Sequence, residues 1–314
     1  MHQVRRLFIA FYSRAKFMAF ENTGKLKNIL RNPDSLNKIY WVGNHGFSLR
    51  SKGKIRKQGS SFIFYSDELP ENFNDPEYES SNPYQLKSLE LIDMYPDGIV
   101  VDLGAGNPKF NFPNVCQVEI RNYPHTDIVT AGNKFPFQDC SVDAVISEAV
   151  LEHVKNPFVY VAEIFRILKP GGKVVLDSAF MQPLHGYPHH YFNTTANALR
   201  QLFQHFEIED IHAGAHHHPW ISLQWMLNSF WFGFKDDSDR DTFRNMTVGE
   251  IMDMLTAHQE IRAEIKNNDD PRYVAEKLTK FNDEHGDSLG VFTNMTDQSR
   301  EELSAGFQIY AKKK

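Results

Sequence analysis

The fold is decided by one stretch of sequence, Val100-Val-Asp-Leu-Gly-Ala-Gly-Asn-Pro108. Its first four residues are mostly apolar, as expected for a buried strand, and glycines follow at positions 104 and 106. Because glycine has no Cβ, such a turn lets a ligand lie against the backbone at the end of the strand. Dinucleotide-binding proteins use a similar turn, but they place a third glycine where this chain has Lys109. The pattern therefore predicts a ligand-binding turn and disfavours a dinucleotide.

Apolar runs and helical stripes alternate on both sides of this turn. Asn82-Pro83 favours the start of a helix, because proline suits the first helical position. Further helices are predicted at 157–168 and 195–203, and strands at 98–103, 115–120, 144–147, 173–177, 206–213 and 306–312. Strands that alternate with helices are typical of a parallel sheet covered on both faces, so the predicted class is α/β.

The segments outside this core have a different character. Residues 1–20 are expected to form an amphipathic helix, with one apolar stripe made of Val4, Leu7, Phe8, Phe11, Ala15 and Met18. Short strands are predicted at 47–49 and 61–65, and residues 214–302 are mostly helical by pattern. We therefore expect a basic extension over 1–82, a core formed by 83–213 and 303–314, and a helical insertion or lid over 214–302.

Composition limits the class of protein and its partners. Hydrophobic residues make up 41% of the 314 residues, which excludes disorder throughout. With Cys116 and Cys140 as its two cysteines, the chain is neither a disulfide scaffold nor a cysteine-rich zinc module. The net charge of −6 does not favour nucleic-acid binding.

Charge is unevenly distributed along the chain. Residues 1–60 contain 13 lysines and arginines but only Glu21 and Asp34 as acids. This basic leader either folds back on the acidic remainder or touches anionic lipid through the helix at 1–20. No run of about 20 apolar residues and no signal peptide is evident, so we expect a cytoplasmic protein with peripheral membrane contact as an option.

The pieces that follow the glycine turn narrow the choice of family. In order they are Glu119, Phe135-Pro-Phe137, Ser141-Val-Asp-Ala-Val-Ile-Ser147, Val150-Leu-Glu-His-Val154 and Glu163-Ile-Phe-Arg-Ile-Leu-Lys-Pro-Gly-Gly172. This ordered set resembles the class I S-adenosylmethionine (SAM)-dependent methyltransferases, type 11 group, over residues 83–213. The resemblance implies a Rossmann-like, mostly parallel sheet whose last strand, here 306–312, is antiparallel. It also implies SAM as the cofactor.

The resemblance assigns roles to individual residues. Glu119 would accept both ribose hydroxyls, and Asp102 would orient the glycine turn. Gly104→Val and Glu119→Ala are expected to weaken SAM binding while the fold stays intact. Ala131 stands where the family often has an aspartate, so adenine recognition would pass to backbone near Gly132 and to apolar side chains. The full set implied for SAM is Asp102, Gly104, Ala105, Gly106, Glu119, Gly132, Phe135 and Ser147.

Eight histidines lie between positions 185 and 218, and His153 follows the predicted strand at 144–147. A base near the methyl donor would remove the proton of a hydroxyl acceptor, with His153 as first choice and His189 as second. Some related O-methyltransferases hold a divalent ion with Glu-x-x-Glu-His, but the first glutamate is Ala149 here. The run at 216–218 is expected to be a loop cluster, because adjacent side chains point apart. No metal site is therefore favoured.

Three functions remain open at this stage. The first is O-methylation of a hydroxyl acceptor, such as a sugar or glycan intermediate. The second is O-methylation of a lipid-borne phenol or quinone precursor, which the basic leader would suit. The third, from another class, is a non-catalytic SAM-binding scaffold.

Overall fold

The structure is a computed structural model. It describes residues 82–107, 112–131, 135–186, 189–213 and 217–267. Before residue 82 it describes the backbone of short strands, and beyond residue 267 it describes single positions between 273 and 303. The helix expected at 1–20, the strand expected at 306–312 and Gly132 all lie outside the described residues.

Within the described part of the chain, a seven-stranded sheet has the order β3-β4-β7-β6-β5-β8-β9. Its neighbours from β4 to β9 pair in parallel, whereas β3 is antiparallel to β4. Its strands are β3 (Ile55–Gln58), β4 (Ser61–Phe64), β5 (Val100–Leu103), β6 (Val115–Glu119), β7 (Ile128–Val129), β8 (Val142–Ser147) and β9 (Leu168–Leu176). A separate antiparallel pair joins β1 (Ile39–Trp41) and β2 (Phe47–Leu49).

The middle of the sheet explains why this segment forms strands. All four residues of β5 are buried, and β5 lies between β6 and β8. A strand buried on both faces is expected to be almost continuously apolar, as this one is. Val100 pairs with Val115 on one side and with Ala144 on the other. Because these pairs are parallel, the carboxyl ends of the three strands meet at one edge of the sheet.

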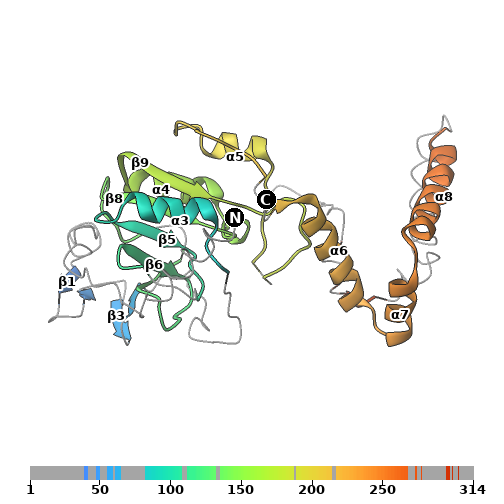
Figure 1. Cartoon of the computed structure of the whole chain (residues 1–314), viewed down its shortest axis with the longest axis horizontal. Coiled ribbons are helices and arrows are strands. Elements are labelled where there is room, and N and C mark those ends of the chain that lie inside the picture. The colour runs from blue at the N-terminus through green and yellow to red at the C-terminus, as the bar shows by residue number, and fades with distance from the viewer. Residues whose placement is uncertain are drawn as a thin grey trace, which may run out of the picture. The chain divides into compact units, whose positions relative to one another are not determined.

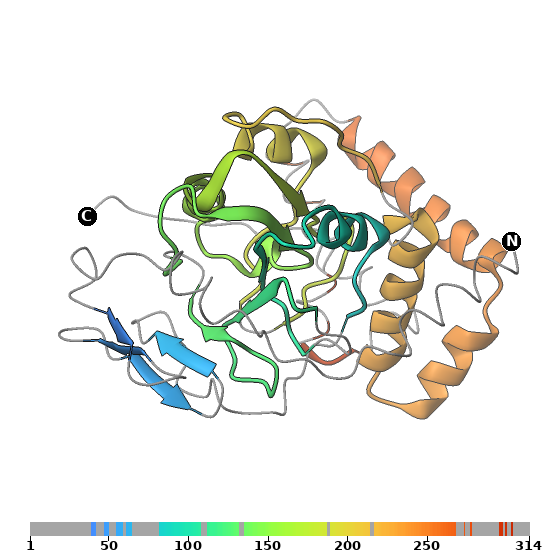
Figure 2. The same ribbon diagram turned by 60° about the vertical axis from the view of Figure 1, so that its left-hand side comes forward.

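Helices cover both faces of this sheet (Figure 1, and after rotation Figure 2). One face, which includes Val100 and Ala144, packs against α3 (Leu86–Met94). The opposite face, which includes Val101, packs against α4 (Pro157–Ile167) and α5 (Ala196–Leu202). Neighbouring residues of a strand point to opposite faces, so a single strand such as β5 contributes side chains to both apolar layers.

Most expected elements are confirmed, with some differences. The first helix begins at Leu86 rather than Pro83, and the short strands β1, β3 and β7 are not among the predicted elements. The strand expected at 206–213 is wrong, because that stretch is irregular. The Phe206 ring instead lies 5.1 Å from that of Phe165 on α4, and Phe206 is partly buried against the core cluster.

The chain divides into two compact units, residues 1–180 with 189–211 and residues 181–188 with 212–314. Helices in the second unit confirm the helical pattern: α6 (Pro219–Gly233), α7 (Asp237–Asn245) and α8 (Val248–Lys266). Thr247 and Glu250 form a capping box that starts α8. The domain boundaries given above stay predictions. Among the described helices, none has the length and apolar character needed to cross a bilayer.

Candidate active site

The glycine turn after β5 is held by the neighbouring strand. The N–H groups of Gly104 and Ala105 both donate to the carbonyl of Val118, at 2.8 and 3.2 Å. Gly104 and Gly106 have φ values of +77° and +62°, which disfavour residues with a Cβ. A Cβ on Gly104 would lie 2.3 Å from Cγ2 of Val150. The expectation that Gly104→Val spares the fold is therefore wrong, because the first clash is with the protein itself.

Glu119 ends β6 beside this turn. Its Oε2 accepts the N–H of Gly106 at 2.8 Å, and its Oε1 accepts the N–H of Ile120 at 2.8 Å. Burial raises the pKa of Glu119, and these N–H donors oppose the rise. The side chain is still partly exposed. The structure therefore brings together Glu119 and the turn residues 104–106. We call these residues, together with Asp102, the cofactor edge.

Asp102, the acid of β5, contacts a residue that the sequence did not single out. Its Oδ2 accepts the hydroxyl of Tyr84 at 2.6 Å, whereas the turn itself is held by Val118. Burial raises the pKa of Asp102 to about 7. Burial also raises the pKa of Tyr84, and the charge of Asp102 adds to that rise. The one sequence signal that could have pointed to the contact of Tyr84 with Asp102 is its position, just after the helix-start signal Asn82-Pro83.

A second carboxylate ties α3 to the same edge of the sheet. Glu148 directly follows β8, and its Oε1 accepts the hydroxyl of Ser88 at 2.5 Å and the N–H of Gln85 at 3.2 Å. The N–H of Gln85 belongs to the cap of α3. This contact gives a physical reason for the late start of the helix, because Glu148 accepts a donor just before its first turn.

The residues expected near adenine lie largely in the core. Phe135 is 3% exposed, and its ring is 5.5 Å from that of Tyr160 in an edge-to-face arrangement. Ser147 is fully buried, with its Oγ 2.8 Å from the Tyr160 hydroxyl. Ala131 is 6% exposed. The contacts of these residues with a ligand stay predictions.

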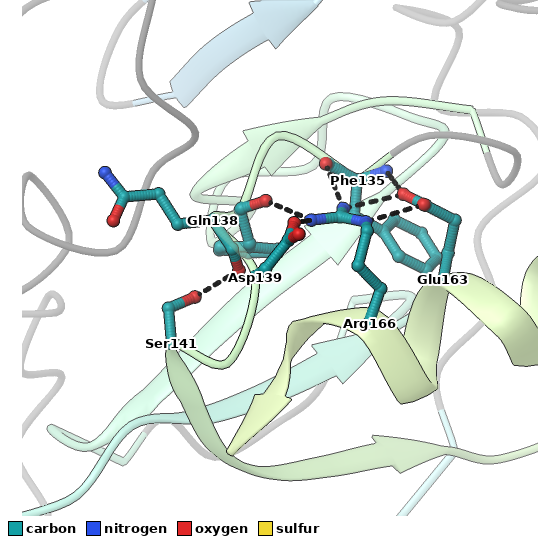
Figure 3. A network of polar contacts seen from close by, with 7 residues as sticks. Phe135, Gln138, Asp139, Ser141, Glu163 and Arg166 are labelled. Carbon is teal, nitrogen blue, oxygen red and sulfur yellow. Dashed lines mark hydrogen bonds and ion pairs between the residues drawn. The ribbon is translucent and has the colours of Figure 1, made fainter. Parts of the chain in front are cut away.

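A polar network holds the loop that begins at Phe135 (Figure 3). Arg166 of α4 donates to the carbonyls of Phe135 and Phe137, at 3.1 and 2.8 Å, and to Asp139 at 2.7 Å. It also pairs through two bonds with Glu163, whose Oε2 accepts the N–H of Phe135 at 3.0 Å. The loop's backbone is thus fixed by α4, which makes Glu163 and Arg166 structural residues of this region.

The predicted base lies beyond the end of β8. His153 closes a 3-10 turn, Leu151–His153, and is only partly exposed. Its Nδ1 is 2.9 Å from the carbonyl oxygen of His189, so the two predicted histidines do come together. Burial lowers the pKa of His153. The imidazole of His189 is exposed and contacts the Tyr191 hydroxyl at 3.1 Å.

Residues 189–194 are bound to this turn along their backbone. The carbonyl of Glu152 accepts the N–H groups of Tyr191 and Phe192, at 2.7 and 3.3 Å. Glu152 is 1% exposed, and burial raises the pKa of its carboxyl group to about 7. We call residues 151–153 together with 189–194 the histidine segment. Its two parts follow β8 and β9. On the side of β5 away from β6, β8 pairs with β5 and β9 pairs with β8.

A family model and several curated relatives that match this chain are described as methyltransferases. A type 11 family model described as a methyltransferase domain matches residues 111–176. An uncharacterized methyltransferase of Mycobacterium tuberculosis is 35% identical over 86 residues, which cover 26% of this chain and 34% of that protein. A Mycolicibacterium smegmatis protein named "probable S-adenosylmethionine-dependent methyltransferase" is 34% identical over 129 residues, covering 37% and 49%. The chain thus spans less than half the length of these relatives.

Two further similarities complete the comparison. The demethylmenaquinone methyltransferase of Streptomyces avermitilis is 29% identical over 110 residues, covering 30% of this chain and 47% of that protein. Among solved structures, the YcgJ protein of Bacillus subtilis has 16% identity and a TM-score of 0.33, covering 50% of this chain and 88% of that one.

The residues of the cofactor edge fit SAM. Glu119 is a partly exposed residue at the end of β6, and its carboxylate suits the two hydroxyl groups of a ribose. The turn beside it is built from glycines whose positive φ keeps side chains away from the strand end. The parallel strands β4-β7-β6-β5-β8-β9 form an open α/β sheet, and in such sheets ligands bind beyond the carboxyl ends of the strands. Residues in and around this sheet therefore form a class I SAM-dependent methyltransferase domain, with SAM as its cofactor.

Proposed function

We propose that this domain methylates a hydroxyl group, with His153 as the general base. The observation that carries the proposal is the 2.9 Å contact between Nδ1 of His153 and the carbonyl of His189, beyond the carboxyl end of β8. Because burial lowers the pKa of His153, the imidazole is largely neutral near pH 7 and can take up a proton. A hydroxyl acceptor needs such a base, whereas a carbon or nitrogen nucleophile need not.

Apart from the general base, methyl transfer needs the protein mainly to bind and align the two reactants. When bound, SAM supplies a methyl group on a sulfonium, which leaves as a neutral thioether. Transfer of that methyl group would go to the acceptor oxygen, and His153 would take up the hydroxyl proton. The remaining residues contribute position and alignment. Glu119 would hold the ribose hydroxyls, and Tyr84 would fix Asp102 beneath the turn.

Two acceptor classes follow from different observations. A sugar or glycan hydroxyl is the acceptor that the sequence resemblance favours. The second class is a lipid-borne phenol or quinone precursor. One relative is named demethylmenaquinone methyltransferase, a name that supports a quinone as the acceptor class and does not bear on transfer to oxygen. The basic leader at 1–60 suits the second class, because a lipid-borne acceptor is reached at an anionic surface.

Methyl transfer from SAM labelled on its methyl group tests the proposal. The full chain would be incubated with polysaccharide and lipid fractions of cell extract, and base-stable label in either fraction would identify the acceptor class. His153→Gln should lower transfer by about 10²–10⁴-fold while SAM affinity stays close to that of the wild type. His205→Gln is the matched control, because His205 is exposed and its ring lies near Phe165 on the outside of α4.

Two outcomes would contradict the proposal. Full activity of His153→Gln would remove the base from the mechanism. A lack of transfer to every fraction, together with tight SAM binding, would favour the non-catalytic scaffold.

A further inference from the structure

The contact between His153 and His189 carries information about the position of a proton. A backbone carbonyl oxygen only accepts hydrogen bonds, so the ring nitrogen that faces it at 2.9 Å must be the donor. Nδ1 of His153 therefore carries the proton in the neutral imidazole. The other nitrogen, Nε2, is then the one with the lone pair.

We propose that residues 189–194 are a positioning clamp, which holds His153 in the Nδ1–H tautomer and makes Nε2 its proton-accepting atom. The use of Nε2 as a catalytic base rests on the function proposed above, whereas the tautomer does not. In this view His189 acts through its backbone carbonyl, and its exposed imidazole has no part in the reaction.

The clamp is fastened at both ends by backbone hydrogen bonds. At its start, Tyr191 donates its N–H to the carbonyl of Glu152 at 2.7 Å. Glu152 immediately precedes His153, so the segment is bonded to the same turn that carries the imidazole. At its end, Thr194 donates its N–H to the carbonyl of Ala179 at 2.7 Å, just after β9. The His189 carbonyl is therefore positioned by the strand ends rather than by its own side chain.

A side-chain contact restricts the ring itself. The rings of His153 and His190 have centroids 5.6 Å apart and planes inclined at 78°, an edge-to-face arrangement. Nε2 of His190 lies 2.8 Å from Oδ1 of Asn193, within the same segment. One segment thus supplies the hydrogen bond that fixes the tautomer and the ring that limits rotation of the imidazole.

Nuclear magnetic resonance of the full chain tests the tautomer without any substrate. Protein labelled with ¹⁵N-histidine would be measured at a pH where His153 is neutral, and its signals assigned by their loss in His153→Gln. We expect a protonated Nδ1 and an unprotonated Nε2. A protonated Nε2, or averaged signals from both tautomers, would overturn the proposal.

A matched pair of variants tests the clamp. Tyr191→Pro removes the N–H that bonds to Glu152, whereas Tyr191→Phe keeps that bond and removes only the hydroxyl. We expect loss of the single tautomer in Tyr191→Pro and wild-type signals in Tyr191→Phe. Unchanged signals in a folded Tyr191→Pro would overturn the clamp. If that variant does not fold, Thr194→Pro removes the bond at the other end, and the wild-type spectrum alone still decides the tautomer.

Failure of the proposed function leaves a different result. If His153→Gln retained full methyl transfer while the wild type showed the Nδ1–H tautomer, the clamp would stand and the catalytic role of His153 would fall. If His153 showed the Nε2–H tautomer and His153→Gln were inactive, the clamp would fall and the catalytic role of His153 would stand.

Discussion

The cofactor edge and the histidine segment are built in different ways. At the cofactor edge, Gly106 and its partner Glu119 are 13 residues apart. Gly106 lies in the turn after β5 and Glu119 ends β6, and these two strands pair directly. In the histidine segment, His153 and its partner His189 are 36 residues apart and belong to a turn and a loop. Strand pairing therefore fixes the cofactor edge. The histidine segment instead depends on how the chain between His153 and His189 brings these two residues back together. We therefore expect the cofactor edge to be rigid, and the histidine segment to accommodate different methyl-acceptor molecules.

The largest effect should come from Gly104→Ala. The left-handed backbone at Gly104 disfavours a Cβ by about 1–2 kcal/mol, and crowding against Val150 adds about 1–3 kcal/mol. We expect the free energy of unfolding to fall by the sum of the two, measured in urea. Adding Val150→Ala should recover the crowding part, which a double-mutant cycle would report as coupling. Additive costs would mean that the turn moves freely.

A smaller loss should follow from Glu119→Ala, and it should appear in SAM affinity. The variant removes the acceptor for the N–H of Gly106 and the carboxylate expected to bind the ribose. Charge-assisted bonds of this kind contribute about 1.5–3 kcal/mol, so calorimetry should show SAM binding weaker by about 10- to 150-fold. Asp127→Asn is the control, since that carboxylate accepts the N–H of Gln117 away from the turn. Equal losses in both variants would contradict a ribose contact.

The same contrast explains what the sequence could predict. The run from Val100 to Leu103, the glycines after it and Glu119 are local signals, and the structure places them together. Ser88 and Glu148 carry no local signal, because their contact crosses from α3 to the residue after β8. Tyr84, which precedes α3 and contacts Asp102 of β5, has only its position after Asn82-Pro83 as a signal. The wrong strand at 206–213 has a related cause, since its alternating pattern is equally suited to packing Phe206 against α4 and α5.

The buried acid of the cofactor edge should make stability depend on pH. Burial raises the pKa of Asp102 to about 7, above its value of about 4 in an unfolded chain. Between those values the folded chain holds a proton that the unfolded chain releases. The contribution of Asp102 to the free energy of unfolding should therefore be largest below pH 4 and should decrease as the pH rises to about 7.

Asp102→Asn removes this titration and keeps an acceptor for the hydroxyl of Tyr84. Across that window, the decrease of unfolding free energy with pH should become shallower by up to about 1.4 kcal/mol per pH unit. Asp127, whose pKa burial also raises to about 7, offers a matched variant in Asp127→Asn with a similar change of slope. A slope unaltered by Asp102→Asn would mean that Asp102 is ionised in the folded chain.

The smallest predicted effects compare the two sides of α3. Ser88 is fully buried and donates its hydroxyl to Glu148, so Ser88→Ala should lower the free energy of unfolding by about 1–2 kcal/mol. Lys87, one residue earlier, pairs with Glu90 at the surface, where both side chains are at least 60% exposed. Water already solvates that pair, so Lys87→Ala should leave the free energy of unfolding almost unchanged. If the two costs were equal, the bond to Glu148 would not hold α3 on the sheet, and the late start of that helix would need another cause.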